Sequence, residues 1–232
     1  MPPSISVVLP MYNEEAYIHR AVAAAQAVLG ELTQDYEIVI VDDASRDRTG
    51  ALADELARRE PRIRVIHNQR NRTLGGTLRA GYAAAGKELI LYTDADLPFD
   101  LQELPRAVRL LEFQEADVLS AYRFDRTLEG PKRTVYTFFY TLLIRALFDL
   151  PVKDVNFSFK LFRRSLLARF PLKSEGSFID AEFLIRARRA GARIIQIGVD
   201  YFPRTRGEST LARPAVILKI VREIIQLWRE LR

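Results

Sequence analysis

Short apolar runs rich in β-branched residues alternate with helical patterns through the first half of the chain. The runs predicted as strands are 5–10, 37–42, 63–68, 88–94 and 117–122. The segments predicted as helices are 14–29, 51–59, 76–85 and 101–113. Continuous apolar strands that alternate with helices are typical of a parallel sheet with both faces covered. The pattern therefore predicts an α/β fold, in which ligands bind outside the carboxyl ends of the strands.

The second half of the chain has a different pattern. An aromatic-rich segment (134–150) precedes strand-like runs at 156–162 and 193–202, with a helix predicted at 180–190 between them. The C-terminal segment is predicted as an amphipathic helix. Its polar face comprises Lys219, Arg222, Glu223, Gln226, Arg229 and Glu230, and its apolar face comprises Ile217, Ile220, Val221, Ile224, Trp228 and Leu231. We predict one domain over residues 1–212, followed by a helix over 213–232 that lies on a membrane, packs on the domain or mediates dimerisation.

The composition narrows the chemistry that the 232 residues can carry. Cysteine is absent and there are two histidines, which excludes disulfides, thiolate metal sites and a His-rich zinc site. Any metal must therefore bind oxygen ligands, which favours Mg²⁺ or Mn²⁺. The formal net charge is +5. We find no nucleic-acid-binding motif, and arginines among apolar stretches of the second half favour lipid phosphates over nucleic acid as the partner.

Two features of the sequence predict whether the protein crosses a membrane or binds to its surface. The first residues carry no basic segment of the kind that opens a secretory signal. The most apolar stretch, TVYTFFYTLLIRALFDL, is interrupted by Arg145 and Asp149 and does not reach the roughly 20 apolar residues that span a bilayer. We therefore expect a cytoplasmic protein that binds peripherally to the cytoplasmic face of a membrane.

Acidic side chains follow the fourth predicted strand directly. Asp94 and Asp96 stand in the sequence YTDADL. Two carboxylates at this spacing can hold a divalent cation and a diphosphate, and the cation would neutralise charge on a departing diphosphate. Because Asp-x-Asp is common in turns, a solvated turn is the alternative. The position at the end of an apolar strand favours the binding site.

Polar residues also follow the first and second strands. After the first strand, Tyr12 is suited to stacking on a base and Glu14 to accepting hydrogen bonds from base or ribose. The alternative is a helix start with Asn13 as its N-cap. After the second strand, one of Asp42 and Asp43 is expected to bond to a base or ribose, and the other to cap the next helix.

The motifs LPMYNEE, VDDASRDRTG and YTDADL, in this order and spacing, resemble those of the inverting family-2 glycosyltransferases of the GT-A fold. Within that family the chain is similar to dolichyl-phosphate mannose synthases and polyprenyl-phosphate glucosyltransferases, over roughly residues 5–210. The resemblance implies a nucleotide-sugar donor, GDP- or UDP-hexose. The residues implied for the nucleotide are Pro10, Tyr12, Glu14 and Asp43. Asp94 and Asp96 are implied for the diphosphate and for Mg²⁺ or Mn²⁺.

The segment NRTLGGTLRAGYAAAG also matches a family element, in which a Gly-rich turn opens a helix against the donor. Gly75 and Gly76 would permit a close approach of the backbone, and the helix N-terminus would favour an anion. The resemblance therefore marks Gly76 as a donor-binding residue. A plain helix start is the alternative.

Downstream motifs resemble those of the polyprenyl-phosphate branch. Arg123 in AYR matches an arginine that faces the donor and acceptor phosphates, and RTRGES matches an acceptor loop at Arg204 and Ser209. DVNFSFKLF resembles an Asp-x-x-x-Gly-Phe-Lys stretch, with Ser158 where glycine is usual. Pro98 stands where the mannose synthases have a glutamine that binds the metal, so the metal preference stays open.

A phosphate acceptor is chemically reasonable because it is already anionic and requires alignment rather than a general base. Arg123, Lys132, Arg133 and Arg204 are candidates for that alignment, with Asp96, Arg123 and Arg204 as the catalytic residues and Ser209 as a further acceptor ligand. We expect in-line displacement with inversion. The segment 131–150 is predicted as a membrane-interface and acceptor segment, with a buried core helix as the alternative.

Two other functions stay open. A transferase that uses a hydroxyl acceptor, such as a glycolipid or polysaccharide, would need a base, for which Asp180 and Glu182 are candidates. Both carboxylates are equally explained by the favourable first turn of a helix. A non-catalytic membrane adaptor that binds nucleotide sugars is the third hypothesis, and the intact Asp94–Asp96 pair argues against it.

Overall fold

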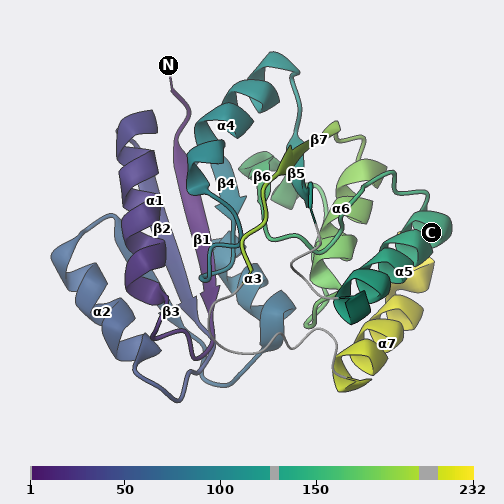
Figure 1. The fold of residues 1–232 in the computed structure, drawn as a ribbon, viewed down its shortest axis with the longest axis horizontal. Coiled ribbons are helices and arrows are strands. Elements are labelled where there is room, and N and C mark those ends of the chain that lie inside the picture. Colours follow the sequence, from purple (N-terminus) through teal and green to yellow (C-terminus); the bar gives the residue numbers. More distant parts are fainter. Residues whose placement is uncertain (1, 126–130, 204–213) are drawn as a thin grey trace.

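The computed structural model describes residues 2–125, 131–203 and 214–232, except for the side chains of residues 131–133 and 214–215. A seven-stranded sheet has the order β3-β2-β1-β4-β6-β5-β7 (Figure 1). The strands are β1 (Ile5–Met11), β2 (Tyr36–Asp42), β3 (Ile63–His67), β4 (Leu89–Tyr92), β5 (Val118–Arg123), β6 (Lys160–Arg163) and β7 (Ile194–Val199). All neighbouring pairs are parallel except those of β6, which runs antiparallel to β4 and β5.

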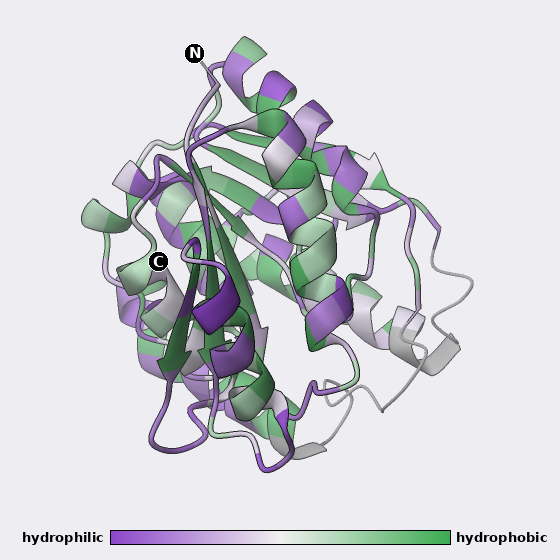
Figure 2. Ribbon diagram, turned by 90° about the vertical axis from the view of Figure 1, so that its left-hand side faces the viewer, coloured by the Kyte–Doolittle hydropathy of each residue, from purple (hydrophilic) through white to green (hydrophobic). Residues whose placement is uncertain are grey.

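Helices cover both faces of this sheet, as predicted for an α/β fold. They are α1 (Ile18–Leu32), α2 (Thr49–Arg59), α3 (Thr73–Ala84), α4 (Leu104–Phe113), α5 (Pro131–Phe148), α6 (Ile179–Arg189) and α7 (Pro214–Leu231). Successive strand side chains point to opposite faces. Val7 and Leu9 therefore join the core beneath α1 and α4, whereas Val8 joins the core beneath α3, α6 and α7. In Figure 2 the strands are mostly hydrophobic, and the covering helices carry both kinds of residue.

The last helix packs on the domain rather than apart from it. Ile220, Ile224 and Leu231 of α7 belong to the buried core. The predicted faces were partly wrong: Val221 is 42% exposed, whereas Glu223 is only 7% exposed. The physical reason is that Glu223 points inward, where its Oε1 accepts bonds from the backbone N–H groups at positions 175 and 176, at 3.0 and 2.7 Å.

Helix α5 is buried on one face, as the alternative of a core helix expects, and its role at a membrane interface stays a prediction. Tyr140 and Ile144 face the core, while an apolar face that includes Phe138 and Phe139 is exposed. Helices α5 and α7 lie side by side (Figure 1), and the rings of Phe148 and Trp228 join them with centroids 5.4 Å apart. Among the described residues, no helix combines the length and apolarity needed to cross a bilayer.

Candidate functional site at the carboxyl ends of the strands

The sheet order places the three acidic motifs side by side. Strand β1 lies between β2 and β4, and all three are parallel, so their carboxyl ends meet at one edge. Met11 pairs with Asp42 in register, and the N–H of Asp43 donates to the carbonyl of Met11 at 2.8 Å. The N–H of Thr93 in turn donates to the carbonyl of Val8 at 3.3 Å.

The loops that follow β1 and β2 are bonded to each other. The N–H of Asn13 donates to Ser45 Oγ at 3.0 Å, and Asn13 Oδ1 accepts from the N–H of Arg46 at 2.8 Å. Asn13 has a φ of 56°, a left-handed conformation that asparagine tolerates better than most residues. The alternative of Asn13 as an N-cap is wrong, because α1 begins at Ile18 after Tyr17. The cross-bonded loops leave the Tyr12 side chain exposed at the edge of the sheet.

The two aspartates after β2 have different partners. Asp42 Oδ1 accepts from the N–H of Ser45 at 3.1 Å, so this carboxylate stabilises its own turn. Asp43 is buried, and its Oδ1 accepts from Asn68 Nδ2 at 2.7 Å and from the N–H of Arg72 at 2.8 Å. The loop after β3 therefore orients Asp43. Sequence reasoning missed Asn68, although its place directly after the third strand was a signal for it.

His67 also belongs to this edge, and its role was not predicted. Its Nδ1 lies 3.0 Å from Asp42 Oδ2, and its Nε2 lies 3.0 Å from Asp54 Oδ1. The hydrogen bond with Asp54, followed by that with Asp42, raises the pKa of His67 above its usual value. The imidazole therefore links β2, β3 and α2 behind the loops of the site.

The carboxylates after β4 repel each other in a partly buried position. Tyr92 donates its hydroxyl proton to Asp94 Oδ1 at 3.2 Å, and the hydroxyl of Ser158 donates to the same carboxylate. Burial, and secondly the charge of Asp96, raise the pKa of Asp94 to about 7. The serine that replaces the usual glycine thus contacts a predicted metal ligand directly.

This donor set fits a hard divalent cation. Mg²⁺ and Mn²⁺ prefer carboxylate, phosphate and water oxygens, and such ions are commonly bound by one or two carboxylates together with substrate phosphates. In the described part of the chain no cluster of three His, Cys, Asp or Glu side chains is suited to a metal. A cation held by Asp94 and Asp96 would have further ligand positions for water or for the donor's diphosphate, and it would relieve the repulsion between the two carboxylates.

Pro98 helps to hold the turn that follows Asp94 and Asp96 in place. Leu97 has a φ of 49°, and the carbonyl of Pro98 accepts the N–H of Phe202 at 2.9 Å. The segment after β7 is thereby held against the turn that carries Asp94 and Asp96.

Behind Asp94, β6 introduces a buried ion pair. Lys160 Nζ lies 3.0 Å from Asp180 Oδ1, with side chains 1% and 4% exposed respectively. Nζ also donates to the carbonyl of Phe157 at 2.6 Å. Burial raises the pKa of Asp180, and the charge of Lys160 opposes that shift. Asp180 is therefore the counter-ion of a buried lysine.

Glu182, the second candidate base, is fully engaged in the fold. Its carboxylate accepts hydrogen bonds from the backbone N–H groups of Lys173 and Ser174, at 3.0 and 2.7 Å. It also accepts a hydrogen bond from Arg186 Nε at 2.7 Å. These bonds hold the loop before α6 against the helix. The contacts of both carboxylates are those of structural groups.

Arg123 ends β5 in a buried setting. Its Nε and Nη2 donate to the two oxygens of Asp154 at 2.7 and 3.0 Å. The guanidinium carbon lies 5.3 Å from the ring centre of Phe157 and 5.5 Å from that of Tyr201. The bidentate pair fixes the guanidinium near the site, and its contact with the acceptor stays a prediction.

The glycines that open α3 are packed against another loop. The N–H groups of Gly75 and Gly76 donate to the carbonyl of Glu175 at 2.9 and 3.3 Å. A Cβ on Gly75 would lie 2.3 Å from the Ser174 carbonyl oxygen. The close approach predicted for this turn is thus an approach to the loop before α6. That Gly76 also contacts the donor stays a prediction.

Four of the predicted acceptor residues cannot be placed with their side chains. Lys132 and Arg133 lie in the first turn of α5, but their side chains are outside the described part of the structure. Arg204 and Ser209 lie in 204–213, which is outside the described residues.

Comparison with known proteins decides the family. The model of the family described as Glycosyl transferase family 2 matches residues 6–170. The chain belongs to that family. Glycosyltransferase AglD of Haloferax volcanii is 31% identical over 98% of this chain, which covers 37% of that protein.

Further family-2 relatives carry informative names. An undecaprenyl-phosphate 4-deoxy-4-formamido-L-arabinose transferase of Pseudomonas aeruginosa is 31% identical over 88% of the chain, which covers 59% of that protein. An undecaprenyl-phosphate mannosyltransferase of Micrococcus luteus is 25% identical over 90% of this chain, which covers 87% of that protein. The chain thus spans less than two thirds of the first two relatives.

Solved structures agree with the family assignment at the level of the fold. Glucosyl-3-phosphoglycerate synthase of Mycobacterium tuberculosis superposes with a TM-score of 0.74 at 22% identity, over 97% of this chain and 80% of that one. The mannosyltransferase PcManGT of Pyrobaculum calidifontis, solved with GDP-Man and Mn²⁺, gives 0.67 at 22% identity, over 97% of this chain and 65% of that one. The GT-A fold expected from the motifs is therefore confirmed.

Proposed function

We propose that this family-2 protein transfers a hexose, mannose or glucose, from a nucleotide sugar to a polyprenyl phosphate, with a divalent cation and inversion at the anomeric carbon. The observation that carries the proposal is the Asp94–Asp96 pair at the exit of β4, beside the loops after β1 and β2. The names of the undecaprenyl-phosphate transferases among the relatives support this acceptor class.

The donor half of the site follows from the three strand exits. Asp43, held by Asn68, would bond to the base or ribose, together with Tyr12 and Glu14 of the adjacent loop. Asp94 and Asp96 would hold Mg²⁺ or Mn²⁺ against the diphosphate. When bound, the cation supplies Lewis-acid neutralisation of the charge on the leaving diphosphate.

The acceptor half requires alignment of an anion. An oxygen of the acceptor phosphate attacks the anomeric carbon, the bond from that carbon to the diphosphate oxygen breaks, and the nucleoside diphosphate leaves. Because the attacking phosphate is already ionised, no base has to remove a proton. The contacts of Asp180 and Glu182 support this acceptor over a hydroxyl, because both carboxylates already hold buried partners. Among the arginines and lysine proposed to align the acceptor, Arg123 is the one whose side chain the structure describes.

A peripheral membrane contact would present the lipid to this site. Helices α5 and α7 expose large apolar side chains on adjacent surfaces. On α5 these are Val135, Tyr136, Phe138, Phe139, Leu142 and Leu143, and on α7 they are Leu218, Val221 and Ile225. An apolar helix face of this kind binds at the boundary between headgroups and acyl chains. The side of the membrane to which it binds stays a prediction.

The function is tested by transfer of radiolabelled sugar from GDP-mannose and, separately, UDP-glucose to a short polyprenyl phosphate, with and without Mg²⁺ or Mn²⁺. We expect a lipid-linked product that requires metal and disappears in Asp96→Ala. Asp149→Asn is the matched control, because its side chain is 94% exposed in a surface ion pair with Arg188. Metal-dependent nucleotide binding without any lipid-linked product would contradict the acceptor and redirect the search to hydroxyl acceptors.

The membrane contact is tested separately by sedimentation with anionic lipid vesicles. Phe138→Ser with Phe139→Ser should reduce the bound fraction several-fold, because each ring is 61% exposed on the proposed face. Phe113→Ser is the control, since this ring is 87% exposed on α4. An equal loss in the control and the double variant would show that binding is not specific to α5.

A further inference from the structure

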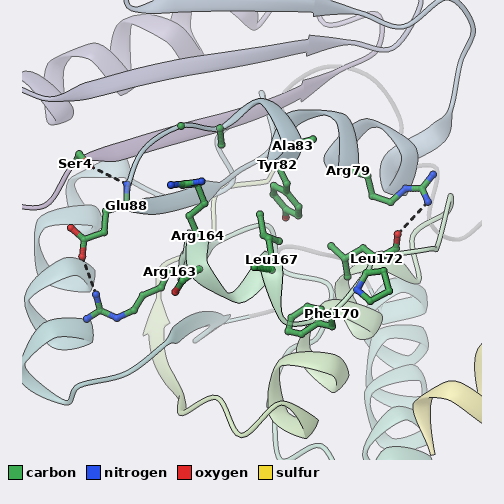
Figure 3. Close-up of a pocket in the computed structure, with 15 residues that line it drawn as sticks. Ser4, Arg79, Tyr82, Ala83, Glu88, Arg163, Arg164, Leu167, Phe170 and Leu172 are labelled. Carbon is green, nitrogen blue, oxygen red and sulfur yellow. Dashed lines mark hydrogen bonds and ion pairs between the residues drawn. The ribbon is translucent and has the colours of Figure 1, made fainter.

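A cavity lies at the opposite end of the sheet from the site described above. Its volume is about 890 Å³, within the usual range for small-molecule sites of roughly 300–1,000 Å³. Its walls come from Ser4 just before β1, Glu88 just before β4, the end of α3, and the 3₁₀ helix Arg164–Ala168 with the segment that follows it (Figure 3). Strands β1 and β4 begin here, whereas Asp94 and Asp96 follow the end of β4, so the cavity is distinct from the donor site.

Three arginines line this cavity and differ in their partners. Arg163 Nη1 lies 3.1 Å from Glu88 Oε1. Arg79 forms an ion pair with Glu175 and donates to the carbonyl of Leu172 at 3.3 Å. Two of the three positive charges are therefore balanced by carboxylates.

Arg164 provides the positive charge that remains. Its Nε donates to the carbonyl of Lys87 at 3.0 Å, which fixes the plane of the guanidinium. In the described part of the chain no carboxylate forms an ion pair with Arg164, and the residue is exposed at the cavity wall. A guanidinium held at one nitrogen presents its terminal N–H groups in the geometry that binds phosphate.

The remainder of the lining is apolar and aromatic. Tyr82, Leu167 and Phe170 lie between Arg164 on one side of the cavity and Arg79, next to Leu172, on the other, as Figure 3 shows. The hydroxyl-bearing residues Ser4 and Ser165 also line the cavity. This combination suits a ligand with an anionic head and an apolar or aromatic part.

We propose that this cavity is a second ligand site that binds a phosphate monoester carrying an apolar group, with Arg164 as the main phosphate ligand. The inference does not depend on the sugar-transfer function, because no residue of the donor site lines the cavity. A soluble aryl or nucleoside phosphate and an anionic lipid headgroup share this chemistry.

The proposal is tested by calorimetric titration of the whole chain with phenyl phosphate and with inorganic phosphate, in EDTA so that metal-dependent binding at Asp94 and Asp96 is absent. We expect saturable binding, tighter for phenyl phosphate, that persists in Asp96→Ala. Arg164→Ala should weaken it at least about tenfold, as expected for loss of a charge-assisted hydrogen bond. Arg164→Lys, which keeps the charge but loses the planar fork, should bind with intermediate affinity.

Arg169→Ala is the matched control, because Arg169 directly follows the same 3₁₀ helix, is exposed and does not line the cavity. Equal weakening in this control and in Arg164→Ala would overturn the proposal in favour of diffuse surface charge. Loss of binding in Asp96→Ala, or no binding of either phosphate to the wild type, would also overturn it. Vesicles containing phosphatidic acid that displace phenyl phosphate would support the site with a lipid as its ligand, whereas an unchanged titration would support a soluble one.

Discussion

The buried pair of Lys160 and Asp180 allows a sharp test of the acceptor class. If Asp180 is the counter-ion of Lys160, Asp180→Asn leaves an ammonium group in the core with the carbonyl of Phe157 as its remaining strong partner. If Asp180 were a general base, the same substitution would abolish transfer without disturbing the fold. The two roles therefore predict different changes in stability and in activity per folded molecule.

The expected magnitude follows from the burial of the pair. The side chains of Lys160 and Asp180 are 1% and 4% exposed, so solvent screening is small. Breaking a buried ion pair by removal of one partner costs about 3–5 kcal/mol. Domains are stable by about 5–15 kcal/mol, so the variant should remain folded but fragile. At an m-value of about 3 kcal/mol/M, a loss of about 4 kcal/mol lowers the urea midpoint by about 1.3 M.

The assay is urea unfolding followed by the fluorescence of Trp228, the single tryptophan, which packs on Phe148. Asp149→Asn provides the matched control, because its exposed ion pair should contribute at most about 1 kcal/mol. Lys160→Met combined with Asp180→Asn should recover much of the loss, since no unpaired charge then remains in the core. Transfer is measured on the same preparations and normalised to the folded fraction.

An Asp180→Asn variant as stable as the wild type and inactive in transfer would refute the counter-ion role. It would also favour a hydroxyl acceptor, with Asp180 as the base. Failure of Lys160→Met to restore the stability of Asp180→Asn would contradict the pairing itself.

Two further predictions concern the turn before α3 and the carboxylates after β4. Gly75→Ala should lower the unfolding free energy by about 1–3 kcal/mol, because its Cβ would lie 2.3 Å from the Ser174 carbonyl oxygen. Gly30→Ala in α1, with nothing within 4 Å of the new Cβ, should instead raise it by about 0.4–1 kcal/mol; equal changes in thermal unfolding would contradict the packing argument. Because the pKa of Asp94 is raised to about 7 and the carboxylate form binds metal, Mn²⁺ affinity measured by electron paramagnetic resonance should fall as pH drops from 8 to 6. An affinity that is flat over this range would show that the pKa of Asp94 is near that of an ordinary aspartate.

The sequence by itself determined the layered α/β architecture. The apolar runs at 5–10 and 37–42 became β1 and β2, because a strand buried on both faces needs apolar side chains at every position. It also determined which loops form the site, since parallel strands bring their carboxyl ends to one edge. The GT-A fold in particular was predicted from the resemblance of LPMYNEE, VDDASRDRTG and YTDADL to the motifs of family-2 glycosyltransferases.

Only the tertiary structure showed which charged residues form buried contacts that stabilise the fold. Lys160 and Asp180 are 20 positions apart, and Asn68 and Asp43 are 25 apart, so no local pattern could pair them. The inward orientation of the Glu223 side chain likewise depends on two backbone N–H groups of a distant loop, which donate to it. Hydrophobic periodicity records which face of an element is apolar, whereas the partner of a buried charge is set by long-range packing. For this reason Lys160 could be identified as the partner of Asp180, and the N–H groups of Lys173 and Ser174 as partners of Glu182, only in three dimensions.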